Sequence, residues 1–404
     1  MGSSKAKPRA APVWLAWGAL VACGARSGLP TGAVAADDAG IPADPCAAPR
    51  PQCVVPGLSC AAPQLTPPAC DPVHGSWACP SGSVVYQRAP SDSVACLPFH
   101  HDPGLRQIDG WGLSSLSELP LPDGRCLWIA SSVTLADGTR ASNVALEPDV
   151  RSFGDCPEQS LSPPTPIVTL EGPSDPSLNI ALYGAYLQQG VTRVFYRVFQ
   201  DDFTELGSGI AHYDPVTGRV LVPSPRKPFP WGLDLDLGDA AFLGDDGFGY
   251  AFGCALPGPY LEEGCLLARL DASDTPSLFA TSGSFLLGAD AQQAASVTSS
   301  GTWLSSLLRA AGQLRHVYIA EYGSELQAHS ADAVVGPWSN AARLASCALP
   351  PDPKAFCSGV VAHAALSDPT RPNELTVSYA IGTTGSGTGS PDDYWPRVAR
   401  VTLP

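Results

Sequence analysis

The sequence predicts an all-β protein, and three observations support this class. Short runs of β-branched, aromatic and aliphatic residues alternate with turn signals such as Asp123-Gly124, Thr217-Gly218 and Asp246-Gly247. Helical periodicity is almost absent from about residue 105 onward. The chain holds 42 prolines and 40 glycines but is still 44% hydrophobic, which is typical of a turn-rich folded protein rather than a disordered one.

Residues 1–22 are predicted to be a signal peptide. The apolar run AAPVWLAWGALVA is too short to span a bilayer and follows three basic residues, Lys5, Lys7 and Arg9. The run ends in LVAC, residues 20–23, which resembles the bacterial lipobox. That resemblance implies a palmitate-type lipid anchor on Cys23 in the bacterial cell envelope and, since no Asp follows it, favours the outer membrane if the organism has two membranes. The alternative is an ordinary secretory signal with a chance cysteine.

The cysteines indicate an oxidising compartment. Of 13 cysteines, all but Cys23 form an even set suited to disulfides, and no CxxC spacing or Cys/His cluster favours zinc. The spacing predicts three pairs: Cys126 with Cys156, Cys254 with Cys265, and Cys347 with Cys357. Six others lie in one segment, where 15 pairings stay open: Cys46, Cys53, Cys60, Cys70, Cys79 and Cys96.

Charge argues against nucleic acid as a partner. The formal net charge is −15, and removal of the signal peptide leaves 20 Lys and Arg against 38 Asp and Glu. No second membrane segment follows, so we expect any membrane attachment to rest on the acyl anchor alone.

The composition divides the chain into four parts. After the signal peptide, residues 23–44 are small and polar, as expected of a flexible tether. Residues 45–104 are rich in Cys and Pro and too poor in aliphatic periodicity to fold without cross-links, so we expect a small disulfide-stapled module. The β pattern fills residues 105–404.

One strand type recurs through the β region. Its copies align on an alanine, and the intervals between successive copies are 66, 57, 60 and 71 residues. The five positions are Ala145, Ala211, Ala268, Ala328 and Ala399. A four-stranded blade with generous loops fits this period, so the sequence predicts a five-bladed β-propeller preceded by the Cys-rich segment. A β-sandwich with irregular strands is the alternative.

Residues 105–404 resemble a family of exported five-bladed propellers of uncharacterised function. The resemblance is carried by IDGWGLSSLSELPLPDGRCLWI, GDAAFLGDDGFGYAFG, LQAHSADAVVGPWS and VVAHAALSDPTRPNELTVSYAIG, in this order and at blade spacing. That family is similar in architecture to glycoside hydrolases such as arabinanases, xylosidases and invertases.

The sequence departs from the family at a step that bears on catalysis. Members usually show aromatic-Gly-Asp where this chain has Ala130, Ser131 and Ser132, so Ser132 replaces a carboxylate. Hydrolysis by two carboxylates needs one acid and one ionised partner. The resemblance offers other candidates, on three separate blades: Asp109 as base, Asp239 as pKa tuner and Glu321 as acid. The alternative is that the two aspartates cap turns and that Glu321 is a solvated strand end.

Aromatic residues provide a second set of candidates. Trp111, Trp231 and Tyr322 would suit stacking on sugar faces if they line one channel mouth. His363 on the fifth blade is either a ligand-binding residue or a channel histidine satisfied by its neighbours. Trp128 lies in a motif where packing between blades is the simpler explanation.

No cofactor is expected from the motifs. DLDLGD, residues 234–239, begins like a calcium loop but lacks the remaining ligands, and its alternation predicts a half-buried strand, so calcium is only an alternative. FHHDP, residues 99–103, lies at a domain junction and predicts a turn. GxSxG, Walker, Rossmann and HExxH motifs are absent from the sequence.

These observations predict a lipid-anchored surface protein whose propeller binds a glycan or another extracellular polymer at its channel mouth. If the protein is an enzyme, we expect a glycoside hydrolase that uses carboxylates on separate blades. A structural or partner-binding propeller is the third hypothesis.

Overall fold

The computed structural model describes residues 46–47, 49–86, 105–108, 116–135, 140–150, 159–161, 165–170, 178–200, 204–223, 237–254, 264–288, 293–299, 304–319, 323–383 and 396–404. They all belong to the unit Pro45–Pro404. In these ranges the one helical segment is a 3-10 turn, Ala364–Leu366, so the predicted all-β class is confirmed. None of the described segments forms a helix long and apolar enough to cross a membrane.

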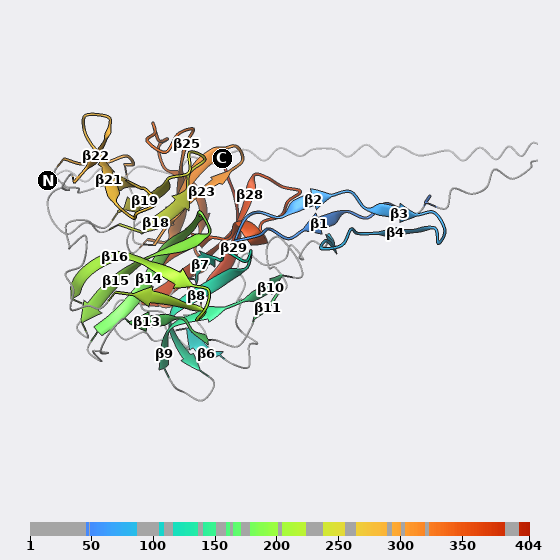
Figure 1. Cartoon of the computed structure of the whole chain (residues 1–404), viewed down its shortest axis with the longest axis horizontal. Helices are drawn as coiled ribbons and strands as arrows, with labels where there is room; N and C mark the ends of the chain where they lie inside the picture. The colour runs from blue at the N-terminus through green and yellow to red at the C-terminus, as the bar shows by residue number, and fades with distance from the viewer. Residues whose placement is uncertain are drawn as a thin grey trace, which may run out of the picture. The chain divides into compact units, whose positions relative to one another are not determined.

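Five sheets of mostly antiparallel strands follow one another along the chain (Figure 1). Blade 1 contains β6 (Leu105–Ile108), β7 (Leu116–Pro120), β8 (Cys126–Leu135), β9 (Arg140–Leu146) and β12 (Thr165–Pro166). Blade 2 contains β13 (Val168–Leu170), β14 (Leu178–Gln188), β15 (Val191–Gln200), β16 (Glu205–Asp214) and β17 (Arg219–Val222). A separate ribbon pairs β10 (Pro148–Val150) with β11 (Gln159–Leu161).

In each of the remaining three blades the strands pair in the order in which they follow along the chain. Blade 3 contains β18 (Ala240–Leu243), β19 (Gly249–Gly253), β20 (Leu266–Leu270), β21 (Pro276–Phe279) and β22 (Phe285–Leu287). Blade 4 contains β23 (Ser306–Ala310), β24 (Gln313–Ile319), β25 (Glu325–Ala331) and β26 (Ala342–Ser346). Blade 5 contains β27 (Ala355–Ala362), β28 (Glu374–Thr383) and β29 (Arg397–Thr402).

The innermost strands of the blades close a ring. Strand β7 contacts β14, β14 contacts β18, β18 contacts β23, β23 contacts β27, and β27 returns to contact β7. Five sheets whose innermost strands meet in cyclic order form a five-bladed propeller, so the predicted fold is confirmed.

The recurrent alanines occupy equivalent positions in this ring. Each lies on the third strand of its blade, counted outward from the innermost strand: Ala145 on β9, Ala211 on β16, Ala268 on β20, Ala328 on β25 and Ala399 on β29. All five are buried. Each faces a small or aliphatic residue across the second strand, for example Ala268 opposite Ala251. The alanine repeats once per blade because a small side chain is needed where two sheets pack face to face.

The hydrophobic core lies between adjacent blades. Four buried clusters each join neighbouring sheets. Between blades 1 and 2, for example, Ile129 packs in one cluster with Val194 and Tyr196. Because each blade is covered on both faces, its central strands are buried almost throughout, as in β19, where all five residues are buried.

The first hairpin of the propeller forms as its turn residues predict. Gly124 has a positive φ of 90°, and the Leu121 N–H donates to the Arg125 carbonyl over 2.9 Å. The following residues Leu127, Trp128 and Ile129 are buried, which confirms that they belong to the core.

The Cys-rich segment folds into two small sheets. One contains β1 (Cys53–Val55), β2 (Gln64–Thr66) and β5 (Val84–Val85), and the other pairs β3 (Ala69–Asp71) with β4 (Ser76–Ala78). Two disulfides within the segment join Cys46 to Cys70 and Cys53 to Cys79.

The predicted pairing of Cys126 with Cys156 is wrong. Cys126 pairs with Cys60, at a Cα–Cα distance of 4.9 Å, and Cys156 lies outside the described residues. The Ser59 N–H donates to the Gly124 carbonyl at 2.7 Å, and the Ser59 hydroxyl donates to the Leu121 carbonyl at 2.9 Å. These bonds hold the turn of Ser59 and Cys60 on the first hairpin, so Cys60 reaches Cys126.

Both predicted short-range disulfides are confirmed. Cys254 and Cys265 join the end of β19 to the start of β20, and their Cα atoms lie 4.0 Å apart. Cys347 and Cys357 join the end of β26 to β27, with a Cα–Cα distance of 6.4 Å.

Breaking the Cys60–Cys126 disulfide should cost more stability than breaking Cys254–Cys265. The first closes a separation of 66 residues and the second a separation of 11. Loop entropy then predicts losses of about 4 and about 3 kcal/mol for the paired Cys→Ser variants, measured by denaturant unfolding. A non-reducing peptide map that links Cys126 to Cys156 would contradict the assignment.

Candidate functional site

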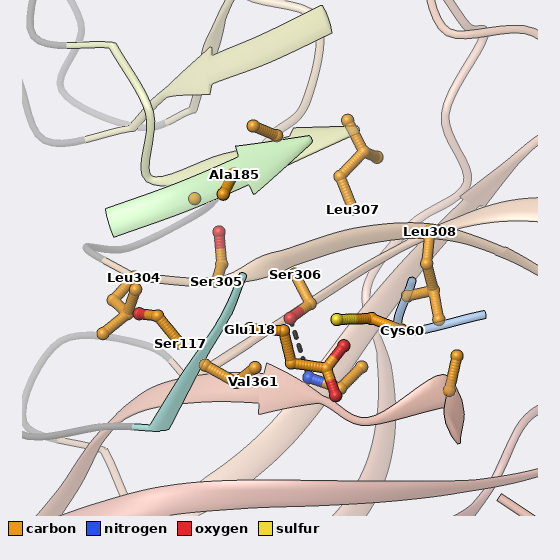
Figure 2. A pocket seen from close by; sticks show the side chains of 14 residues that line it. Cys60, Ser117, Glu118, Ala185, Leu304, Ser305, Ser306, Leu307, Leu308 and Val361 are labelled. Atoms are coloured by element: carbon orange, nitrogen blue, oxygen red, sulfur yellow. Dashed lines mark hydrogen bonds between the residues drawn. The ribbon is translucent and has the colours of Figure 1, made fainter. Parts of the chain in front are cut away.

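A cavity of about 140 Å³ lies where the five innermost strands meet (Figure 2). Every blade contributes to its wall, and the Cys-rich segment contributes Cys60. Most of the lining is small or aliphatic: Gly184, Ala185, Ala241, Leu304, Leu307, Leu308, Val361, Ala362 and Ala364. The polar lining consists of Ser117, Glu118, Ser305 and Ser306. Small residues on the inner strands therefore leave room for the cavity as well as for packing.

Glu118 supplies the one carboxylate of this lining. Strand β7 carries it, and its side chain is 14% exposed. Oε1 lies 2.8 Å from His363 Nδ1. Within the described part of the chain no hydrogen bond reaches Oε2, and Figure 2 shows the carboxylate among the side chains that line the cavity. One carboxylate oxygen is thus fixed, and the other can accept a bond from a ligand.

His363 holds Glu118 in place from the neighbouring blade. It follows β27 and is fully buried, and its Nε2 lies 2.7 Å from the hydroxyl of buried Ser378. An ionised carboxylate can only accept, so Nδ1 donates to Glu118, and Nε2 shares a hydrogen bond with the Ser378 hydroxyl. The ring centroid also lies 4.7 Å from that of Trp128. Both ring nitrogens are thus occupied, so His363 positions Glu118 in this structure, and its predicted ligand-binding role stays a prediction.

The series Ser378, His363 and Glu118 does not form a nucleophile site. In a serine hydrolase the hydroxyl faces the substrate and the carboxylate stands behind the histidine. Here the Ser378 hydroxyl is buried, and the carboxylate faces the cavity. The order is reversed, so this arrangement presents an acceptor rather than an attacking oxygen.

Ser117 adds a polar atom without a partner. The residue is 3% exposed and lines the cavity, and its buried hydroxyl forms no hydrogen bond with the described residues. A buried hydroxyl left in this state costs about 1–3 kcal/mol. Such a group therefore requires an explanation.

Ser305 connects the cavity to a buried cluster of rings. Its hydroxyl lies 2.9 Å from Nε2 of His316, which is fully buried. The rings of His316, Tyr318 and His329 form a cluster, in which Tyr318 lies 5.2 Å from each imidazole and the two imidazoles lie 6.1 Å apart. Burial and the nearby His329 lower the pKa of His316 to about 3. His316 is therefore a neutral part of the scaffold at working pH.

Asp239 has a structural role in the described residues, and its predicted role as pKa tuner beside Glu321 stays a prediction. It is fully buried, and Oδ1 lies 2.6 Å from Nη2 of Arg197, a residue of blade 2. Oδ2 accepts a 2.7 Å bond from the Cys254 N–H, and the Asp239 carbonyl accepts one from Ser305 N–H. Both carboxylate oxygens are committed, so Asp239 ties blades 2, 3 and 4 together and is not part of the cavity lining.

Several predicted residues cannot be placed. Asp109, Glu321, Trp111, Trp231, Tyr322 and Cys23 lie outside the described residues, as do residues 99–103. Of the DLDLGD segment, Leu237, Gly238 and Asp239 are described. The aromatic platform and the roles of Asp109 and Glu321 therefore stay predictions.

Metal binding is not assigned to any group of described residues. Two clusters bring potential ligand atoms within 4.8 Å: Cys254 and Cys265 with His316, and Cys60 and Cys126 with Glu118. The cysteines of each cluster are joined as disulfides. Thiolates are the metal-binding form of cysteine, so neither cluster offers a suitable donor set. Calcium stays a prediction.

Sequence reasoning did not single out Glu118 or Ser117. The signal was a Ser-Glu pair in an otherwise apolar inner strand, LSELP. A buried Glu is rare unless it is paired, so this position differed from the solvent-facing acids around it.

Comparison with known proteins supports the fold. Neither a protein-family model nor a curated protein matches the chain. A proposed hydrolase from Bacteroides ovatus is similar in structure, with a TM-score of 0.50 and 14% identity over 75% of this chain and 87% of that chain. A likeness at this identity is evidence of a shared fold alone.

Two sugar-bound structures are also similar, at lower scores. The GH43_1 enzyme from Xanthomonas citri in complex with xylose gives a TM-score of 0.43 at 14% identity, over 74% of this chain and 93% of that chain. An exo-β-1,3-galactanase from Phanerochaete chrysosporium with β-1,3-galactotriose gives 0.42 at 12% identity, over 74% of this chain and 60% of that chain.

Asp239→Asn should destabilise the protein by about 3–5 kcal/mol, because it leaves the buried Arg197 without this counter-charge. Urea unfolding measures the loss. The matched control is Asp245→Asn, which removes an 83% exposed carboxylate paired with Arg309 and should cost at most about 1 kcal/mol. Equal stability of the two variants would contradict the structural assignment of Asp239.

The depressed pKa of His316 predicts a loss of stability in mild acid. Because the folded-state pKa of about 3 lies below the unfolded value of 6.5, the contribution is complete above pH 6.5 and declines as pH falls toward 3. The slope is at most about 1.4 kcal/mol per pH unit. His316→Gln should flatten the unfolding free energy between pH 6.5 and 4.5, above the range of paired carboxylates such as Asp274, whose pKa is lowered. If the variant and the parent show the same dependence of unfolding free energy on pH, the lowered pKa of His316 is contradicted.

Proposed function

We propose that the propeller binds a glycan or another extracellular polymer through the central cavity and does not cleave it. The observation that carries this proposal is the single carboxylate of the described lining, Glu118, fixed on one oxygen and open on the other. Hydrolysis through two carboxylates needs a second one within about 10 Å. Among the described residues Asp239 does not supply it, since both of its oxygens are committed, and Asp109 and Glu321 lie outside those residues.

The proposal extends to the site of action. We place the chain in the bacterial envelope, with Cys23 acylated and residues 23–44 as the tether. Five disulfides among the described cysteines support an oxidising compartment. The lipobox-like LVAC at residues 20–23 supports the anchor.

A glycan array and product analysis test binding and cleavage together. We use the mature chain with Cys23→Ala, which removes the acylation site and keeps the rest of the protein. We expect at least one polysaccharide class to bind, and we expect no reducing ends to be released from it. Glu118→Gln should weaken that binding by tenfold or more, because the amide replaces a charged acceptor with a neutral one.

The controls separate the three hypotheses. Asp245→Asn removes an exposed charge and should leave binding unchanged. Trp231→Ala tests the predicted aromatic platform. Release of oligosaccharides that Glu118→Gln abolishes would favour a hydrolase, and silence across all glycans would favour a structural propeller.

A further inference from the structure

We infer that the ligand group entering the central cavity carries a free amine, so that the bound glycan contains a non-acetylated amino sugar. This inference rests on the proposed function and specifies the ligand of the same site. Three properties of the lining lead to it: its charge, its uncommitted carboxylate oxygen and its lack of aromatic side chains.

The charge of the lining selects a cation. Among the fourteen lining residues Glu118 is the one with an ionisable side chain other than Cys60, whose sulfur is in a disulfide. Lys, Arg and His are absent from this described wall. The chain as a whole carries a formal charge of −15, which adds to the negative potential of a low-dielectric cavity. Acidic sugars are repelled from such a cavity, and a protonated amine is attracted.

The uncommitted oxygen of Glu118 matches an ammonium group. Oε2 accepts no bond from the described residues. An ammonium group offers three donors, and charge-assisted hydrogen bonds are about twice as strong as neutral ones. The buried Ser117 hydroxyl lies on the opposite side of β7, toward Leu304, and is not part of this contact (Figure 2).

The lining is poorly suited to the face of a neutral sugar. The fourteen lining residues include no Trp, Tyr or Phe, so the described wall has no platform on which a ring could stack. The volume of about 140 Å³ is also below the roughly 300–1,000 Å³ of sites that enclose a drug-sized ligand. The cavity therefore suits one small polar group inserted end-on.

Calorimetry with monosaccharides that carry one positive charge or none tests the inference. Glucosamine, N-acetylglucosamine and xylose are titrated into the mature Cys23→Ala chain at a pH below the pKa of the amine. We expect glucosamine to bind at least tenfold more tightly than the other two, with affinity falling as salt is added. A single charge per ligand limits non-specific attraction to the acidic surface.

Two variants remove the same charge at different places. Glu118→Gln should abolish the preference for the amine, whereas Asp245→Asn should preserve it. Equal losses in the two variants would attribute the preference to surface charge and overturn the inference.

Ser117→Ala adds a test that separates binding from folding. The hydroxyl makes no bond in the described structure, so the variant should unfold at the same temperature as the parent or a higher one. We expect its affinity for glucosamine to be unchanged, because this hydroxyl points away from the Glu118 carboxylate (Figure 2). A loss as large as that of Glu118→Gln would overturn the assignment of the amine to Glu118.

The failures of the two proposals differ. If xylose or N-acetylglucosamine binds as tightly as glucosamine, the amine inference fails and glycan binding stands. If no sugar in these titrations and no glycan on the array binds, both fail.

Discussion

The contact between Glu118 and His363 is the interaction on which the ring and the site both depend. A propeller needs its last blade held against its first, and in the described residues blade 5 consists of β27, β28 and β29 alone. At this seam β27 meets β7, the buried imidazole bonds the carboxylate, and its ring lies against Trp128. Removing one partner of a buried polar pair costs more than the pair contributes, so the seam specifies one closed arrangement.

The N-terminal segment reinforces the same seam from both sides. Its Cys60 is joined to Cys126 on blade 1, and the Tyr86 hydroxyl donates a 2.8 Å bond to Asp368 on blade 5. A segment that holds the first and last blades acts as a strap, and its contacts belong to the stability of the propeller. This explains why a residue of the Cys-rich segment lines the central cavity. Through these two contacts the Cys-rich segment stabilises the propeller.

The sequence was sufficient to predict the blades but not the contacts that join blade 5 and the Cys-rich segment to blade 1. The alanine repeat and the Asp123-Gly124 turn depend on local packing and local backbone conformation, so they could be read directly. The partner of Cys126 depends on which distant turn lies on the first hairpin, and spacing contains no such information. The same limit applies to blade contacts such as that of Arg193 with Asp274, which join positions 81 residues apart.

Asp239 and Glu118 show why residue type alone did not identify the site. Both are carboxylates on or beside an inner strand, and both bond a basic side chain of another blade. They differ in the second oxygen, which in Asp239 accepts from the Cys254 N–H and in Glu118 remains open to the cavity. Glu118 can therefore accept a hydrogen bond from a ligand, whereas Asp239 cannot. Since Glu118 also joins the first and last blades, the proposed ligand would stabilise the folded propeller by its binding free energy.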